Sequence, residues 1–203
     1  MYHSVFSPFY CSLFILLCLS FLFDLSMQSL KVGSLNINGG RDRHKRALIA
    51  EVSTQKRFDV LFLQETHTNP ADETDWGIWW GGPCALSHGT NLSAGVAVLF
   101  RATAHATILS STEVVKGRFL IVRAEIESSV FCFVNIYAPN QGAERVGFFN
   151  TLKNELKNYH QDHLIIGGDF NCTLDFTVDR TSEEPHPQSS QNLNILPSNI
   201  WIC

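Results

Sequence analysis

The stretch HLIIGGDFN, residues 163–171, is a short apolar run that passes through two glycines to an acid and an amide. Its first half predicts a buried strand, and the glycine pair marks the end of that strand. Asp169 and Asn171 therefore stand at a strand end, where a rigid sheet can hold polar side chains in fixed places. Taken alone, the same two residues are also compatible with a simple Asx-turn.

Three other apolar runs also carry a polar residue at or near their ends: LKVGSLNIN (30–38) with Asn36, DVLFLQ (59–64) followed by Glu65, and VFCFVNIY (130–137) ending on Tyr137. Together with Asp169 and Asn171, these residues suit Mg²⁺ and phosphate, because Mg²⁺ prefers oxygen ligands and takes only one or two protein carboxylates. Each also has an ordinary interpretation, as a turn former, a surface acid or a half-buried strand aromatic.

The rest of the pattern predicts an α/β or α+β domain. We expect further strands at residues 94–101 and 119–126, and helices at 41–57 and 141–160. Residues 67–93 contain Gly81, Gly82, Pro83 and three of the tryptophans, and they predict a long loop.

Five motifs, read in chain order, resemble the endonuclease/exonuclease/phosphatase family: SLNINGG (34–40), LFLQET (61–66), SAGVAVLF (93–100), VNIYAPN (134–140) and IIGGDFN (165–171). A single motif is a weak signal, but five in the family's order are a strong one. The resemblance covers about residues 30–180. The wording QETH, NIYAPN and GGDFNCTLD is most similar to the endonuclease domain of LINE-type (non-LTR) retrotransposons. It implies a partial four-layer α/β sandwich of the deoxyribonuclease type, with the C-terminal strands missing.

The resemblance also assigns roles to the strand-end residues. It implies that Glu65 binds Mg²⁺, or Mn²⁺ in its place, and that Asn36 and Asp169 complete the metal site. It implies that Tyr137 contacts the scissile phosphate and that Asn171 donates a hydrogen bond to it. Asp169 would orient or deprotonate the attacking water, or assist the leaving group. The expected partner is DNA, cleaved by in-line displacement at phosphorus.

The segment after Asn171 departs from the family pattern. Members of the family continue through further strands to a histidine paired with an aspartate, whereas only 32 residues follow Asn171 here. The histidine among them is His186, and its context Glu-Pro-His-Pro predicts that it lies in a loop. We therefore expect impaired or absent activity. Two alternatives stay open: a phosphomonoesterase or lipid phosphatase of the same superfamily, and a non-catalytic vestigial or membrane-anchored fragment.

Composition excludes some classes of protein but does not distinguish a nuclease from a phosphatase. The formal net charge is −4, and since a nuclease with an acidic metal site can be acidic, this value does not separate a nuclease from a phosphatase. The six cysteines include no CxxC pair, which argues against a zinc site and favours a reducing compartment. No protein partner can be inferred.

The N-terminal segment is strongly apolar. Residues 5–23 carry no charge and approach the ~20 residues that a membrane-spanning helix needs. A membrane anchor, a signal peptide and an adventitious extension before Met27 are all compatible with it. We expect a nuclear or cytoplasmic protein in the last case and a membrane protein in the first. The chain thus divides into a hydrophobic segment (1–28), a partial catalytic domain (29–180) and an irregular tail (181–203).

Overall fold

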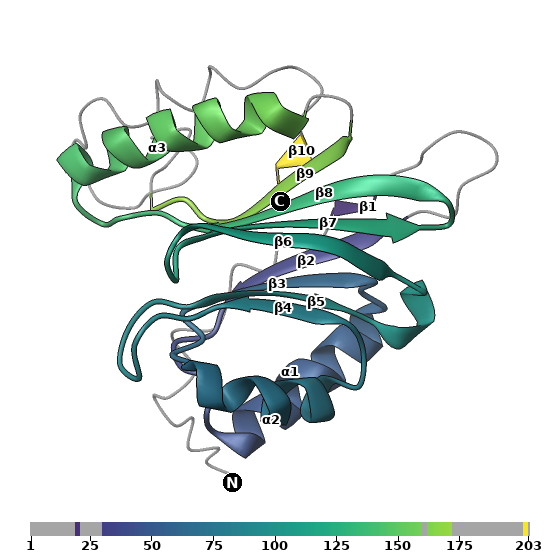
Figure 1. The fold of residues 1–203 in the computed structure, drawn as a ribbon. Helices are drawn as coiled ribbons and strands as arrows, with labels where there is room; N and C mark the ends of the chain where they lie inside the picture. Colours follow the sequence, from purple (N-terminus) through teal and green to yellow (C-terminus); the bar gives the residue numbers. More distant parts are fainter. Residues whose placement is uncertain (1–18, 21–29, 160–161, 172–200, 203) are drawn as a thin grey trace, which may run out of the picture.

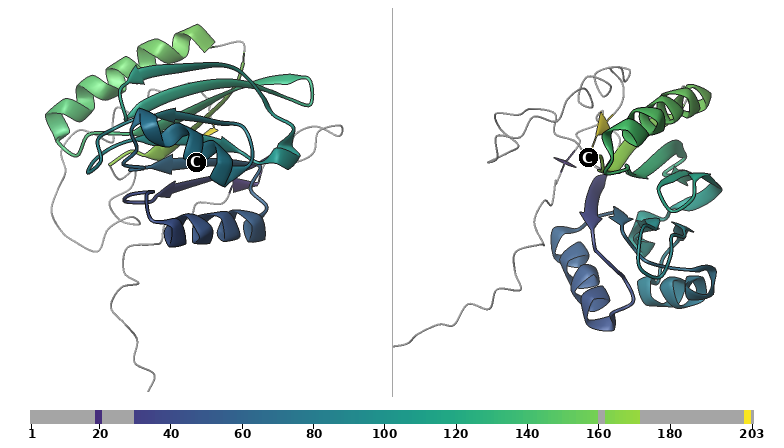
Figure 2. Two further views of the ribbon diagram at one scale, coloured as in Figure 1. Left: turned by 60° about the horizontal axis from the view of Figure 1, so that its bottom comes forward. Right: turned by 90° about the vertical axis from the view of Figure 1, so that its left-hand side faces the viewer.

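The computed structural model describes residues 19–20, 30–159, 162–171 and 201–202 (Figure 1). Within these residues two sheets pack face to face, and helices cover the outer face of each sheet. The views in Figure 2 agree that α1 and α3 lie on opposite sides of the sheet pair. The layers therefore run helix, sheet, sheet, helix, which is the predicted four-layer α/β sandwich.

The first sheet has the order β1-β2-β3-β5-β4. Its strands are β1 (Leu19–Ser20), β2 (Lys31–Asn36), β3 (Val60–Gln64), β4 (Cys84–Ser87) and β5 (Val96–Phe100). β2 and β3 run parallel, and β5 is antiparallel to both β3 and β4. Every residue of β3 and β5 is buried, as a strand covered on both faces requires.

The second sheet has the order β10-β9-β8-β7-β6. Its strands are β6 (Thr107–Val115), β7 (Phe119–Ile126), β8 (Ser129–Tyr137), β9 (His163–Asp169) and β10 (Trp201–Ile202). β6, β7 and β8 form an antiparallel meander, and β9 then pairs parallel with β8. Each sheet therefore contains a central parallel pair whose strands end at the same edge.

Three apolar cores hold the layers together. The core between the sheets contains Phe62, Phe100 and Phe133, all fully buried. A second core lies under α3 (Gly142–Leu156), and a third lies under α1 (Arg43–Lys56) and α2 (Glu73–Trp80). Short 3₁₀ turns at Pro70–Asp72, Ala102–Ala104 and Lys157–Tyr159 complete the described elements.

The prediction of a long loop at residues 67–93 was wrong. That segment holds α2 and β4, and β6 was not predicted either. α2 has weak helix formers, but Trp76 is only 1% exposed, so burial of its ring in the core outweighs propensity. The 3₁₀ turn Pro70–Asp72 directly before α2 does carry a start signal, because Asn69 and Asp72 form a capping box around Pro70. The predicted helices and the other predicted strands are present, with ends shifted by a few residues.

The two chain ends are described only in part. Leu19 and Ser20, inside the apolar segment 5–23, pair antiparallel with Val32 and Lys31 of β2. The rest of segment 1–28 lies outside the described residues, as does most of the tail 181–203 and with it His186. In the tail, β10 pairs parallel with β9. Among the described residues, none of the helices combines the length and apolar character that crossing a bilayer requires.

Candidate active site

The predicted site residues meet where the two parallel strand pairs end. In the first sheet, Asn36 ends β2 beside Gln64 of β3, so Glu65 follows directly. In the second sheet, Tyr137 ends β8 beside Asp169, which ends β9. Because parallel strands bring their carboxyl ends to one edge, both pairs present polar side chains there. Their roles stay predictions, but the structure does bring these residues together.

Asn36 connects the two sheets at this edge. Its side-chain Nδ2 donates to Glu65 Oε1 at 2.9 Å and to Asp169 Oδ2 at 3.1 Å. Because both oxygens accept from the same nitrogen, the distance between Glu65 Oε1 and Asp169 Oδ2 cannot exceed the sum of these two hydrogen-bond lengths. Its Oδ1 accepts from the backbone N–H of Asn38 at 3.1 Å, which fixes the orientation of the amide. Two carboxylates of separate sheets thus converge on one side-chain amide.

Tyr137 lies against Glu65 and is almost buried, at 9% exposed. Burial, followed by a hydrogen bond with Glu65, raises the pKa of Tyr137 to about 12. The guanidinium of Arg118 lies over its ring, 4.8 Å from the centroid, and donates to its backbone oxygen at 3.3 Å. The phenol therefore keeps its proton at neutral pH and can serve as a hydrogen-bond donor.

The segment from Gly168 to Asn171 fixes the acid on the second sheet. Asp169 Oδ1 accepts from the backbone N–H of Asn171 at 3.0 Å, and Asn171 Nδ2 donates to Ala138 O at 2.7 Å. Gly168 has a φ of 135°, and a Cβ there would lie 2.0 Å from Ile136 O. The second glycine of the GGD motif is therefore required for β9 to approach β8.

Two residues near the site were missed by the sequence analysis. Arg118 follows Gly117 in the β6–β7 turn, and no local pattern marks it as a site residue. His67 lies within the QETH wording, and its Nε2 is 3.6 Å from Glu65 Oε2, without a hydrogen-bond partner. A polar residue two positions after the expected metal ligand was a signal that could have identified it.

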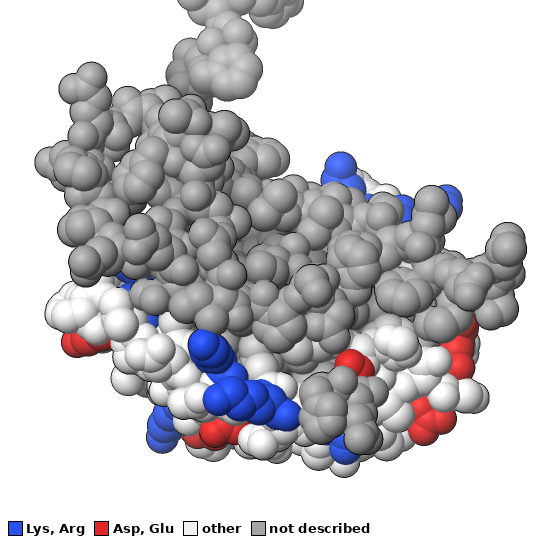
Figure 3. Space-filling view, turned by 90° about the horizontal axis from the view of Figure 1, so that it is seen from above, with Lys and Arg blue, Asp and Glu red and all other residues white. Residues whose placement is uncertain are grey.

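Charge on the described surface is mixed. On the face seen from above in Figure 3, lysines and arginines appear in separate groups, and some of these groups have acidic residues beside them. Within the described residues, no three side chains of the His, Cys, Asp and Glu types gather in a way that could hold a metal. The acids at the site are the pair Glu65 and Asp169.

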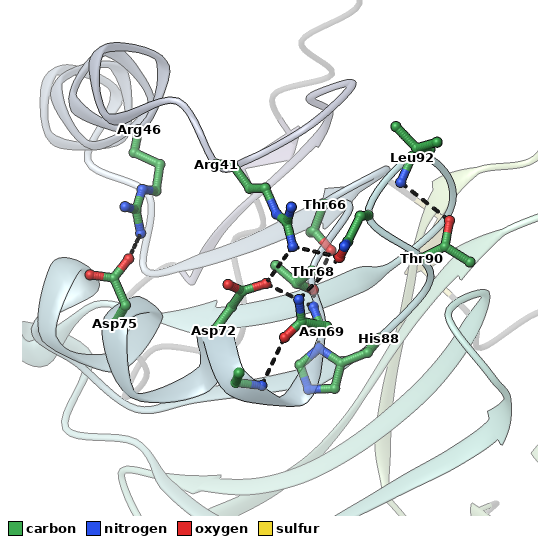
Figure 4. A network of polar contacts seen from close by, with 12 residues as sticks. Arg41, Arg46, Thr66, Thr68, Asn69, Asp72, Asp75, His88, Thr90 and Leu92 are labelled. Carbon is green, nitrogen blue, oxygen red and sulfur yellow. Dashed lines mark hydrogen bonds and ion pairs between the residues drawn. The ribbon is translucent and has the colours of Figure 1, made fainter.

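A hydrogen-bonded network joins the segments that follow β2 and β3 (Figure 4). Arg41, just after β2, donates to Asn91 Oδ1 and forms an ion pair with Asp72 at 3.5 Å. Asn69 Nδ2 donates to the same Asn91 oxygen at 3.0 Å. These contacts link the loop around Asn91 and the start of α2 to the segment that leaves Asn36.

A second chain of contacts runs behind Glu65. The hydroxyls of Thr66 and Thr68 are 3.0 Å apart, and His88 joins Thr68 at 3.1 Å to Glu73 at 2.9 Å. A carboxylate, an imidazole and a hydroxyl in series resemble a hydrolase triad. Thr68, however, is 0% exposed, so no substrate can reach its oxygen. This series therefore supports the loop after β3 and does not act as a nucleophile.

The family model of the Endonuclease/Exonuclease/phosphatase family matches residues 33–189. The chain belongs to this family. The matched region contains Asn36, Glu65, Tyr137, Asp169 and Asn171.

The chain is also similar in sequence to a transposon protein. The chain is 38% identical over 148 residues to the Transposon TX1 uncharacterized 149 kDa protein of Xenopus laevis, a match that covers 72% of this chain and 11% of that protein. The chain thus spans about a tenth of that relative's length. The predicted family and the likeness to a transposon protein are confirmed.

Solved structures agree with the fold. An AP endonuclease from Archaeoglobus fulgidus superimposes with a TM-score of 0.57 at 19% identity, covering 72% of this chain and 59% of that one. D. rerio TDP2 complexed with a single-strand DNA product gives 0.53 at 17% identity, covering 71% and 61%. A protein of unknown function from Enterococcus faecalis V583 gives 0.55 at 14% identity, covering 70% and 66%. At these identities the likeness supports the shared sandwich fold alone.

Proposed function

We propose that this endonuclease/exonuclease/phosphatase domain is the metal-binding part of a Mg²⁺-dependent phosphodiester hydrolase that nicks DNA. The observation that carries the proposal is the bridge of Asn36 between Glu65 and Asp169, with the Tyr137 phenol hydrogen-bonded to Glu65. Two carboxylates, a neutral phenol and two amides at one edge form a set suited to a phosphate and a divalent cation.

The residues present fit Mg²⁺. Glu65 supplies one carboxylate and Asp169 a second from the facing sheet, which matches the one or two carboxylates that Mg²⁺ takes. Asn36 Nδ2 bonds one oxygen of each carboxylate and so fixes their orientations. When bound, Mg²⁺ would neutralise charge on the phosphoryl oxygens.

The protein groups then have separate tasks at the phosphate. The Tyr137 phenol keeps its proton and shares it with Glu65 here, and with a cation on Glu65 the same O–H would be free to donate to a phosphoryl oxygen. Asn171 has one amide hydrogen committed to Ala138 O and a second available to the phosphate. Asp169 has one oxygen held by Asn36 and the other by the Asn171 backbone, so its carboxylate is oriented to accept a proton from water.

DNA is proposed as the substrate because of the relatives. The curated relative is a transposon protein, and one solved relative carries a single-strand DNA product. We further propose that the 203-residue chain cleaves slowly. The family resemblance implies a histidine at the phosphate that no motif matches after Asn171, and a positioned acid–base group contributes about 10²–10⁴-fold.

The test is a nicking assay on supercoiled plasmid with the 203-residue chain, with Mg²⁺ and with EDTA. We expect slow conversion to open circles that requires Mg²⁺ and falls at least about 10²-fold with Asp169→Ala or Glu65→Ala. Glu51→Gln, an exposed acid on α1, is the control and should cleave like wild type.

Inositol phosphates and a simple phosphomonoester are run in parallel. Faster release of inorganic phosphate than of nicked plasmid would favour the phosphatase alternative. Nicking that survives both alanine substitutions would show that the site lies elsewhere. If the wild-type chain neither binds Mn²⁺ nor cleaves any of these substrates, the result would favour the alternative of a non-catalytic fragment.

A further inference from the structure

A buried polar cluster joins the two sheets directly behind the proposed active site. It consists of Ser34 on β2, Gln64 on β3 and Asn135 on β8, which are 7%, 1% and 0% exposed. Gln64 Nε2 donates to Asn135 Oδ1 at 2.8 Å and to Ser34 Oγ at 3.2 Å. Asn135 Nδ2 donates across the interface to Leu63 O at 2.9 Å and Ala97 O at 2.8 Å.

Strand geometry relates this cluster to the site. Side chains two positions apart on a strand point to the same face. Ser34 therefore shares a face of β2 with Asn36, and Asn135 shares a face of β8 with Tyr137. Gln64 lies one residue before Glu65. Each member of the cluster thus stands one or two residues from a site residue of its own strand.

The location is otherwise apolar, and this makes the cluster informative. On the same strand faces, Phe62 and Phe133 belong to the core between the sheets. Apolar contact is non-directional, so it sets the spacing of the two sheets more strictly than their register. A set of fully buried hydrogen bonds has fixed lengths and angles, and apolar residues of the same shape in its place can be nearly neutral for stability. For the side-chain pairs of Gln64 with Ser34 and Asn135, stability alone therefore gives no reason for polar groups, whereas Asn135 also satisfies the backbone oxygens of Leu63 and Ala97.

We propose that Gln64 and Asn135 are positioning residues, which hold Tyr137 and Asp169 of one sheet in register with Asn36 and Glu65 of the other and so set the affinity of the site for its divalent cation. This inference rests on the proposed function, because it assumes that Glu65 and Asp169 bind the metal. A site divided between two sheets needs such a device, since ligands must be held within about 0.5 Å of their working positions.

The experiment separates positioning from stability by removing the whole cluster. The triple variant Ser34→Ala, Gln64→Met, Asn135→Leu replaces the polar side chains by apolar ones of similar shape, whereas Asn135→Leu alone leaves Gln64 without its partner. Leu152→Ala, in the separate core under α3, is the control for destabilisation. For each full-length variant we would measure Mn²⁺ affinity by electron paramagnetic resonance and the Tm by circular dichroism.

We expect the triple variant to melt at a higher temperature than Asn135→Leu but to bind Mn²⁺ about 10-fold or more weakly than wild type, as for other residues that orient metal ligands. Leu152→Ala should lower the Tm and leave Mn²⁺ affinity within about twofold of wild type. Wild-type affinity in the triple variant would overturn the inference. The inference would also be overturned if Leu152→Ala lost as much Mn²⁺ affinity as the triple variant at a similar Tm. Unchanged Mn²⁺ binding by Glu65→Ala would instead overturn the proposed function.

Discussion

Glu65 combines a proposed metal ligand with an unfavourable backbone conformation. Its φ is 53°, in the left-handed region, and His67, two residues farther along, has a φ of 52°. The loop is held there by the backbone N–H of Gly39, which donates to Glu65 O at 2.6 Å, and by Thr66, which donates to Gly95 O at 3.1 Å. Such strain costs about 1–3 kcal/mol and persists where surrounding structure enforces it, often at functional sites.

This strain gives the first residue-scale prediction. Glu65→Gly and Glu65→Ala both remove the carboxylate, but only glycine adopts this φ without cost. We expect the free energy of unfolding of the glycine variant to be about 1 kcal/mol higher than that of the alanine variant. Both should lose Mn²⁺ binding. Urea denaturation gives the stabilities, and an alanine variant as stable as the glycine variant would show that the backbone is not strained.

The raised pKa of Tyr137 gives a second prediction at this scale. With a pKa of about 12, it should ionise later than a free tyrosine when absorbance at 295 nm is recorded just after a rapid rise in pH. The folded chain holds this proton more tightly than the unfolded chain, whose tyrosines ionise near ~10. Its contribution to stability is therefore complete below that pH and is lost as the pH rises toward about 12. Tyr137→Phe should remove the late step, and a late step that survives would belong to another tyrosine.

At the scale of elements, β9 depends on one glycine. A Cβ at Gly168 would lie 2.0 Å from Ile136 O, so alanine there must push β9 away from β8 and displace Asp169. In α3, a Cβ at Gly147 would meet nothing within 4 Å. We expect Gly168→Ala to destabilise the fold and abolish Mn²⁺ binding. The matched Gly147→Ala should stabilise by about 0.5–1 kcal/mol with binding unchanged. Thermal melting and Mn²⁺ titration check both, and normal binding in Gly168→Ala would contradict the close packing of β9.

The whole molecule is held together by the aromatic core between its sheets. Phe133 of the second sheet makes edge-on contacts with Phe62 and Phe100 of the first, at ring separations of 6.3 and 5.1 Å. Removing its ring creates a cavity in contact with both sheets. We expect Phe133→Ala to lower the free energy of unfolding by about 3–5 kcal/mol.

Because this core is shared, unfolding should be a single transition. Three of the four tryptophans lie on α2 and report on the first sheet, and Cys132, 0% exposed, reports on the second. Tryptophan fluorescence and alkylation of Cys132 should therefore change at the same urea concentration. Two separate midpoints would show that the sheets unfold independently.

The sequence by itself determined which residues stand at strand ends and which family they resemble, because strand alternation and motif wording are local properties. It placed Asn36, Tyr137 and Asp169 correctly at the ends of their strands and Glu65 directly after its strand. Only the tertiary structure decided which side chains of the two sheets lie opposite one another. Periodicity shows which face of a strand is buried but not its partner in the other sheet. For this reason the bridge of Asn36, the guanidinium of Arg118 over Tyr137 and the pairing of Gln64 with Asn135 could not be predicted.

Helix α2 was missed for a related reason, since burial of Trp76 against distant strands outweighs the weak helix propensity of its own segment.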